Sequence, residues 1–267
     1  MEIIAHRGVH RRKEEENTTF AFNKAVLLGC PMIELDVRCT CPRDKQLVVI
    51  HDDIFNVRGF KVRVADQRLD QLIESGLVVD RLIGAGGHNL APELRIPTLR
   101  FVLKLFLHRT KINIELKDAG SGLALYLTLD RMLRNVKPEI ARESLKNLVV
   151  SSFLKEELLL FKAYELGAQI ETALLLSRLS PSRIGRGRLG NWLKKNNIQA
   201  LHMPYEIVTA EAVNYFKSKE IGVRIYTLNI LEQMEYFESI GVQGIFTDKA
   251  EEFIRTQRTP LANVVAS

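Results

Sequence analysis

Short apolar runs alternate with longer segments of helical periodicity along most of the chain. The runs have the length of β-strands, whereas the segments between them place apolar residues three or four positions apart, as amphipathic helices do. Eight strands are predicted in this alternation, centred near residues 3, 33, 113, 149, 171, 201, 224 and 244. The pattern predicts an α/β protein with a closed (β/α)8 TIM barrel. The alternative, an open doubly wound sheet, is weakened because no glycine-rich dinucleotide fingerprint follows the first strand.

One further apolar run interrupts the alternation. Leu47–His51 begins ten residues after the predicted second strand, Met32–Val37, and this gap is too short for a helical crossover. A short hairpin with its turn near Pro42–Lys45 is therefore predicted as an insertion after the second strand. The next segment, Asp53–Pro97, is predicted to be irregular and to shape the substrate entrance. The 267 residues suit one barrel, so a single domain spanning 1–267 is expected.

Residue types that carry acid–base and metal chemistry gather where predicted strands end. Two histidines, three carboxylates, an arginine and a lysine close four separate apolar runs. They are His6, Arg7, Glu34, Asp36, His51, Glu115 and Lys117. In a barrel of parallel strands such positions converge on one mouth, where the chemistry of these barrels takes place.

The three carboxylates predict a metal site. Glu34 and Asp36 lie two positions apart on one strand, so both side chains point to the same face. A buried carboxylate without a partner is costly and therefore requires a cation. Together with Glu115, this pair predicts one divalent cation, Mg²⁺ or Ca²⁺, with Mn²⁺ as a third candidate. The alternative interpretation is a structural salt bridge to Arg38 or another base.

The two histidines suit a paired general acid and base near neutral pH, with His6 and His51 as the candidates. Which of them donates the proton is left open. Arg7 and Lys117 suit binding of a phosphate group. For Lys117 the alternative is a solvated loop lysine. Taken together, the residues predict metal-assisted cleavage of a phosphate ester.

The composition of the chain limits the classes of ligand and partner that it is expected to bind. The net charge of +6 favours anionic ligands but is too small to imply nucleic acid, and no apolar run is long enough for stable membrane insertion. The cysteines, Cys30, Cys39 and Cys41, are odd in number and are interpreted as reduced thiols of a cytoplasmic protein. The basic stretch Arg178–Lys195 is interpreted as a solvated surface, with contact to an anionic lipid surface as the alternative. No role is assigned to the remaining histidines, which are His10, His88, His108 and His202.

A series of motifs resembles those of the glycerophosphodiester phosphodiesterases over nearly the whole chain and in the same order. The motifs are His6-Arg7-Gly8, Glu16 to Phe22, Ile33 to Val37, Val49 to Asp52, Ile96 to Leu99, Ile114 to Lys117, Ser152-Phe153, Thr227 to Asn229 and Gly241 to Asp248. The chain departs from the family pattern at Tyr226, Gln243 and Ala250 and in the loop Cys39 to Gln46, where substrate choice rather than a catalytic group would be affected.

The resemblance implies hydrolysis of a glycerophosphodiester to glycerol 3-phosphate and an alcohol. It also implies a barrel in which Glu34, Asp36 and Glu115 hold a divalent cation, with the histidine, arginine and lysine roles given above. One alternative keeps the site and changes the substrate to a lysophospholipid, as in a lysophospholipase D. A second alternative is a non-catalytic barrel that binds a phosphate ligand. The alcohol half of the substrate and the oligomeric state are left open.

Overall fold

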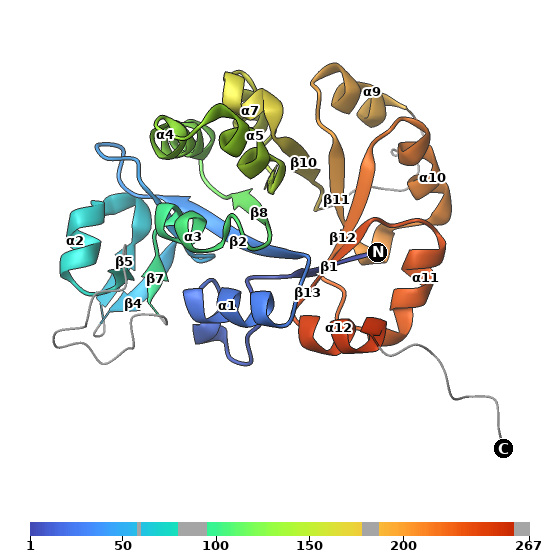
Figure 1. Cartoon of the computed structure of the whole chain (residues 1–267), viewed down its shortest axis with the longest axis horizontal. Coiled ribbons are helices and arrows are strands. Elements are labelled where there is room, and N and C mark those ends of the chain that lie inside the picture. The colour runs from blue at the N-terminus through green and yellow to red at the C-terminus, as the bar shows by residue number, and fades with distance from the viewer. Residues whose placement is uncertain (58–59, 80–94, 178–186, 259–267) are drawn as a thin grey trace.

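The computed structural model describes residues 1–57, 60–79, 95–177 and 187–258 as alternating strands and helices (Figure 1). Eight parallel strands form the centre, and their bounds are β1 Glu2–Ala5, β2 Met32–Cys39, β8 Lys111–Leu116, β9 Leu148–Ser152, β10 Glu171–Leu175, β11 Ala200–Pro204, β12 Gly222–Tyr226 and β13 Gly244–Thr247. Because β1 pairs with both β2 and β13, the sheet closes on itself. The predicted (β/α)8 barrel is thereby confirmed.

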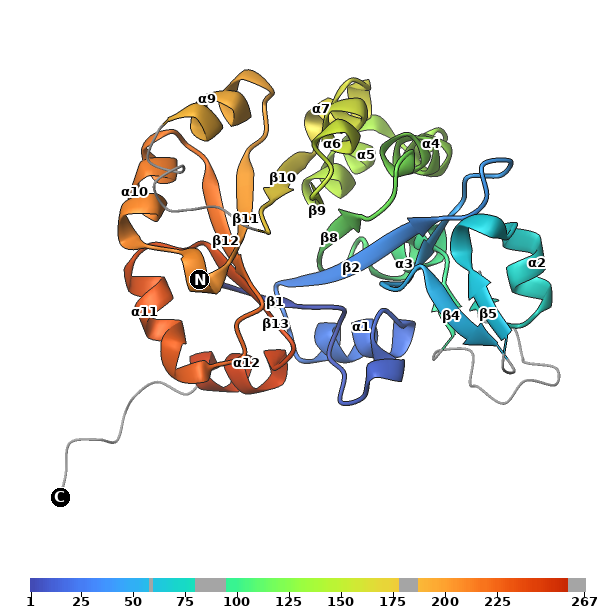
Figure 2. The ribbon, with the colours of Figure 1, turned by 180° about the vertical axis from the view of Figure 1, so that it is seen from behind.

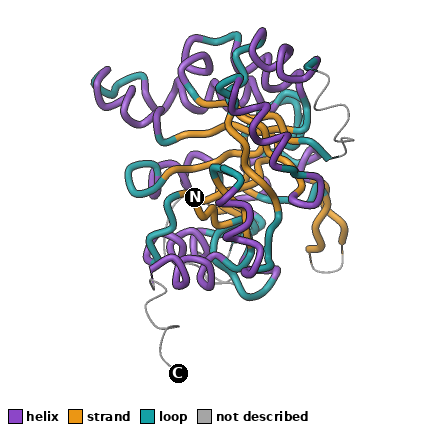
Figure 3. Tube along the Cα trace, turned by 90° about the vertical axis from the view of Figure 1, so that its right-hand side faces the viewer, coloured by secondary structure: helices purple, strands orange, loops and turns teal. Residues whose placement is uncertain are grey.

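Helices surround the strands in a ring, as Figures 1 and 2 show from opposite sides. Their bounds are α1 Thr19–Leu27, α3 Leu99–Phe106, α4 Ser121–Leu133, α5 Pro138–Lys146, α6 Lys155–Lys162, α7 Glu165–Gln169, α9 Arg188–Lys195, α10 Ala210–Ser218, α11 Met234–Ser239 and α12 Ala250–Arg258. Thr18, Thr98 and Thr209 cap three of them by accepting a backbone N–H of the first turn. Figure 3 shows the strands gathered inside this helical layer.

Most of the core lies between the outer face of the barrel and the helices. Five phenylalanines from five different helices are fully buried there, and they are Phe22, Phe106, Phe161, Phe216 and Phe253. Burial of large apolar side chains of this kind is the main contribution to the stability of the folded chain.

The insertion after β2 is larger than predicted. Its elements are β3 Leu47–Val49, β4 Ile54–Val57, β5 Phe60–Arg63, α2 Leu69–Glu74, β6 Val78–Val79 and β7 Ile96–Pro97. β3 pairs antiparallel with β2, as predicted, but the segment predicted to be irregular contains a second hairpin, a helix and a parallel strand pair. Strands of two to four residues are too short for periodicity to reveal. Residues 80–94 of this segment lie outside the described residues.

The inside of the barrel is layered along its axis. At the end opposite the mouth, Arg224 of β12 forms ion pairs with Glu2 of β1 and Glu171 of β10. An apolar layer follows, made by Ile4, Met32, Val149, Ala173, Ala200 and Phe246. Polar residues occupy the inward positions above it, toward the carboxyl ends of the strands. The apolar layer therefore separates two charged zones within one barrel.

The cysteines and the basic stretch can be compared with their predictions. All three cysteines are free and buried, and burial raises the pKa of Cys30 to about 11 and that of Cys39 to about 12. No helix among the described residues combines the length and the apolar character needed to cross a bilayer. The cytoplasmic location stays a prediction.

Residues 178–186 of the basic stretch lie outside the described residues, and Trp192 of its described part packs against the ammonium of Lys155.

Removal of side-chain volume from the apolar layer should weaken the fold. Ile4 is fully buried, so Ile4→Ala is expected to lower the free energy of unfolding by about 2–5 kcal/mol. Denaturant titration followed by circular dichroism measures this change. The matched control is Ile140→Ala, since Ile140 is half exposed on α5, and it should change stability by less than about 0.5 kcal/mol. Equal effects of the two substitutions would contradict the layered interior.

Candidate active site

Three carboxylates form the centre of the barrel mouth. Asp36 of β2 lies directly beside Glu115 of β8 in the strand register, and Glu34 precedes Asp36 on the same face. One oxygen from each side chain lies within 4.8 Å of the others, and all three residues are buried. The alternative partner considered above, Arg38, instead binds Asp118 and the backbone carbonyl of His51. The structure therefore brings the three predicted metal ligands together, and the bases that form ion pairs with them are Arg7 and Lys117 rather than Arg38.

The three carboxylates shift one another's pKa values because they lie close together. Burial and the charge of Asp36 raise the pKa of Glu34 to about 8, and the same two causes raise the pKa of Glu115. Burial also acts on Asp36, but the cations of Lys117 and Arg7 hold its pKa below its usual range. The Oε1 atom of Glu34 has no hydrogen-bond partner among the described residues. The three side chains offer only oxygen atoms as ligands, and one of these oxygens has no partner. Such a set fits a hard divalent cation, which would offset the repulsion among the carboxylates.

Two side-chain cations stand beside the carboxylates. The Nζ atom of Lys117 lies 2.7 Å from Glu115 Oε1 and 3.3 Å from Asp36 Oδ1. The guanidinium of Arg7 lies 3.1 Å from Asp36 Oδ2 and 2.7 Å from Glu16 Oε2. Lys117 is thus largely buried between carboxylates rather than a solvated loop residue. Both cations lie close enough to the cluster to contact an anion bound there.

A tight turn after β1 aims Arg7 at the cluster. Arg7 and Gly8 both adopt positive φ, +55° and +84°, and the backbone N–H of Arg7 donates to Glu34 Oε2 at 2.9 Å. A Cβ atom on Gly8 would lie 2.7 Å from the backbone of Ala21, so only glycine fits at this position. Asn17, which lies just before α1, links this turn to the cluster, because its backbone N–H donates to the Arg7 carbonyl while its side chain donates to Asp36 Oδ2 and accepts from the Asp36 N–H.

His6 is oriented by hydrogen bonds from residues that follow the last two strands of the barrel, β12 and β13. Its Nδ1 atom lies 2.6 Å from Asp248 Oδ1, and Asn229 donates to the other oxygen of Asp248 at 2.7 Å. The Nε2 atom points toward the cluster, 4.0 Å from Glu34 Oε2. Burial alone would lower the pKa of His6, but the hydrogen bond to Asp248 and the charge of Glu34 raise it.

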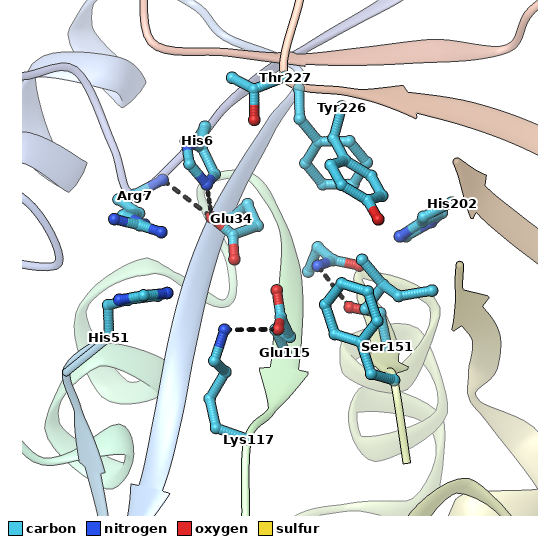
Figure 4. A pocket seen from close by; sticks show the side chains of 14 residues that line it. His6, Arg7, Glu34, His51, Glu115, Lys117, Ser151, His202, Tyr226 and Thr227 are labelled. Carbon is cyan, nitrogen blue, oxygen red and sulfur yellow. Dashed lines mark hydrogen bonds and ion pairs between the residues drawn. The ribbon is translucent and has the colours of Figure 1, made fainter. Parts of the chain in front are cut away.

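His51 occupies a more open position on the opposite side of Arg7. It follows β3 in the insertion, and its Nδ1 atom lies 2.8 Å from Asp52 Oδ1. Its side chain is 39% exposed, compared with 19% for His6. Each histidine is therefore paired with its own aspartate, and each has its Nε2 atom left over for chemistry. Figure 4 shows both imidazoles beside Arg7.

A pocket of about 240 Å³ extends from these residues into the barrel. Six of the seven predicted site residues line it, and they are His6, Arg7, Glu34, His51, Glu115 and Lys117. Asp36, the seventh, contacts two of them through its ion pairs. The catalytic and ligand roles of the seven stay predictions. Among the departures from the family pattern, Tyr226 lines this pocket, whereas Gln243 lies in a hollow at the opposite end of the barrel.

Several residues at the site were missed or were given no role in the sequence. Asp248 and Asn229 occur in a motif of the family resemblance, yet the sequence does not show that they hold His6. Asn113 lies two positions before Glu115, and this spacing is the signal that would have placed it on the inward face. His202, to which the sequence analysis assigned no role, also lines the pocket.

The comparisons with known proteins agree with this geometry. A sequence profile of the Glycerophosphoryl diester phosphodiesterase family matches residues 6–252. A glycerophosphodiester phosphodiesterase of Caldanaerobacter subterraneus subsp. tengcongensis is 31% identical over 265 residues, which cover 96% of this chain and 97% of that one. A lysophospholipase D of Rattus norvegicus is 35% identical over 115 residues, which cover 43% of this chain and 35% of that one.

A solved structure shares the fold. It is that of a phosphodiesterase of Oleispira antarctica in complex with the product sn-glycerol-3-phosphate, and it superposes with a TM-score of 0.73. The two chains are 20% identical, and the superposition covers 97% of each.

The hydrogen bond from Asp248 should govern the protonation of His6. Asp248→Asn removes the negative charge, so the pKa of His6 is expected to fall. A pH titration of the His6 ring by long-range ¹H–¹⁵N NMR, on metal-free protein, measures the change. Asp130→Asn makes the same chemical change in a surface pair with Arg134 and should leave His6 unaffected. An unchanged His6 pKa in the Asp248 variant would rule out this positioning.

Proposed function

The chain belongs to the glycerophosphoryl diester phosphodiesterase family, and we propose that it hydrolyses a glycerophosphodiester to sn-glycerol 3-phosphate and an alcohol. Glycerophosphocholine and glycerophosphoethanolamine are the proposed substrates. The observation that carries the proposal is the buried cluster of Glu34, Asp36 and Glu115 between two cations and two histidines. A phosphodiester anion fits this arrangement in charge and in size.

Glu34, Asp36 and Glu115 would hold one divalent cation. When bound, such a cation polarises a phosphoryl oxygen and can lower the pKa of a nucleophilic water. Mg²⁺, Ca²⁺ and Mn²⁺ all accept carboxylate oxygens, so the chemistry of the donors does not choose among them.

Arg7 and Lys117 are proposed to bind the phosphate oxygens. Arg7 offers a planar set of N–H donors that remains ionised, and Lys117 offers a compact charge whose pKa is raised by Glu115 and Asp36 against the effect of burial. Both side chains are already fixed by carboxylates, so they need little reorganisation when the substrate binds. Fixed charges of this kind stabilise the negative charge that develops on the phosphoryl oxygens.

His6 and His51 are proposed as the acid–base pair. One imidazole accepts the proton of the nucleophile, and the other, as imidazolium, donates a proton to the oxygen of the departing alcohol. The nucleophile is either a water molecule or the glycerol 2-hydroxyl. In the second case a cyclic phosphate forms first, and water then opens it, with the two histidines exchanging roles.

A lysophospholipid substrate is the second candidate. Two observations favour it: the segment shared with a lysophospholipase D, and a second hollow of about 540 Å³ that also borders His51. Ile54, Phe55 and Ile96 give this hollow an apolar side. Lysophosphatidylcholine, supplied in the assay below, tests this candidate directly.

Removal of the metal should abolish turnover. Release of sn-glycerol 3-phosphate from glycerophosphocholine is expected to stop after dialysis against EDTA and to return with Mg²⁺, Ca²⁺ or Mn²⁺. Glu115→Gln should lose metal binding in isothermal titration, whereas Glu139→Gln, the same change on the exposed part of α5, should keep it. Full turnover in metal-free protein would contradict the proposal. Folded, metal-loaded protein that cleaves neither glycerophosphodiesters nor lysophosphatidylcholine would point to a binding barrel instead.

The variants of the two histidines should differ in activity when the leaving group of the substrate changes. His6→Ala and His51→Ala are each expected to lower kcat on glycerophosphocholine by roughly 10²- to 10⁴-fold. With the p-nitrophenyl ester of glycerol 3-phosphate, whose leaving group needs no proton, only the variant that lacks the acid should recover. Steady-state kinetics on both substrates identifies that residue. Equal losses of both variants on both substrates would contradict the paired roles.

A further inference from the structure

Beyond the carboxylates, the pocket is lined by uncharged residues, which are partly apolar, such as Leu175 and Phe246. Three of these uncharged residues are polar and buried, and they are Asn113, Ser151 and His202. Figure 4 shows His202 on the side opposite His6 and Arg7, with its ring directed into the pocket. The pocket therefore has a charged half at the carboxylate cluster and a neutral half at His202.

Several polar atoms of the neutral half lack a partner. Neither ring nitrogen of His202 has a hydrogen-bond partner among the described residues, and neither has Asn113 Oδ1. The amide nitrogen of Asn113 is occupied, since it donates to Ser151 Oγ at 2.9 Å. A buried polar atom without a partner costs about 1–3 kcal/mol, so such atoms normally meet a ligand or an ordered water. Three of them at one end of a pocket point to a ligand that carries hydroxyl groups.

The chemical form of His202 suits a hydroxyl better than an anion. Burial and the charge of Arg224 lower its pKa well below the usual value, so the ring is neutral. A neutral imidazole offers one donor and one acceptor, as a hydroxyl does. Its ring also packs against Phe246, with the centroids 4.8 Å apart, which fixes its position. A negatively charged group would bind more strongly in the other half of the pocket, beside the cations of Arg7 and Lys117.

The neutral half is closed at its inner end. Phe246 belongs to the apolar layer that crosses the barrel beneath the pocket, together with Ile4 and Met32. A long apolar chain entering here would have to displace this fully packed layer. The neutral half therefore suits a short polyol and excludes an acyl chain.

We propose that His202, Asn113 and Ser151 form a subsite that binds the hydroxyl groups of the glycerol moiety. This inference rests on the proposed function and deepens it, because it orients the substrate. With glycerol inside and the phosphate at the carboxylate cluster, the second alcohol extends outward past His51. Acylation of the terminal glycerol hydroxyl, as in a lysophospholipid, would then block binding.

Binding of phosphate monoesters tests the subsite without any turnover. Isothermal titration with Mg²⁺-loaded protein compares sn-glycerol 3-phosphate with propyl phosphate, which has the same charge and chain length but no hydroxyl group. The wild-type protein is expected to prefer sn-glycerol 3-phosphate by at least about tenfold, since one or more neutral hydrogen bonds are at stake. Equal affinities of the wild-type protein for the two ligands would overturn the inference and require no variant.

Substitution of His202 identifies the residue involved. His202→Phe should reduce the preference to less than about threefold while leaving the affinity for propyl phosphate unchanged. His202→Gln, which keeps a donor and an acceptor, should retain more of the preference, and His108→Phe on the surface should retain all of it. A loss of affinity for both ligands in equal proportion would mean that His202 has a merely structural role, and would overturn the assignment.

The proposed hydrolysis and the proposed glycerol subsite would be contradicted by different results. Selective binding of sn-glycerol 3-phosphate without hydrolysis of any diester would contradict the proposed function and support the subsite. Hydrolysis of glycerophosphocholine together with equal binding of the two monoesters would support the function and overturn the subsite. Cleavage of lysophosphatidylcholine as fast as glycerophosphocholine would likewise overturn the subsite.

Discussion

Mutual repulsion among three buried carboxylates is the constraint around which the mouth of this barrel is organised. Glu34, Asp36 and Glu115 are brought together by the register of two neighbouring strands and are removed from water by the closed sheet. Arg7 and Lys117 compensate only part of their charge, since the pKa of Glu34 remains raised to about 8. Under the proposed function, the same arrangement would hold a cation and a phosphate, and the cation would offset this repulsion.

The rest of the barrel isolates this charged zone. The apolar layer that includes Ile4 and Met32 separates the mouth from the ion pairs of Arg224 at the other end. Without it, water could pass along the barrel axis and screen both sets of charges. Low polarity below the cluster and fixed dipoles around it would strengthen the electrostatic interaction with the phosphate that the proposed function places there. The packed apolar layer therefore supports the electrostatic interactions at the mouth of the barrel.

The sequence predicted the barrel and the seven central residues because both leave local signals. Alternating apolar runs define the strands, and the two-residue spacing of Glu34 and Asp36 places both on the inward face. The insertion was only partly predicted, since its strands are too short to show a period. The partnership of His6 with Asp248 depends on barrel closure, which no local pattern records. His202 was passed over because a single histidine within an apolar strand is more often structural than functional.

The closure between β1 and β13 also sets the order in which the site can be assembled. His6 is held at its backbone by Thr247 and at its ring by Asp248, which are 241 and 242 residues further along the chain. During synthesis on the ribosome, His6 emerges first but finds these partners last. A nascent chain can form most of its strands and helices and still lack an oriented imidazole. The orientation of the His6 ring therefore depends on completion of the barrel, although His6 lies at the start of the chain.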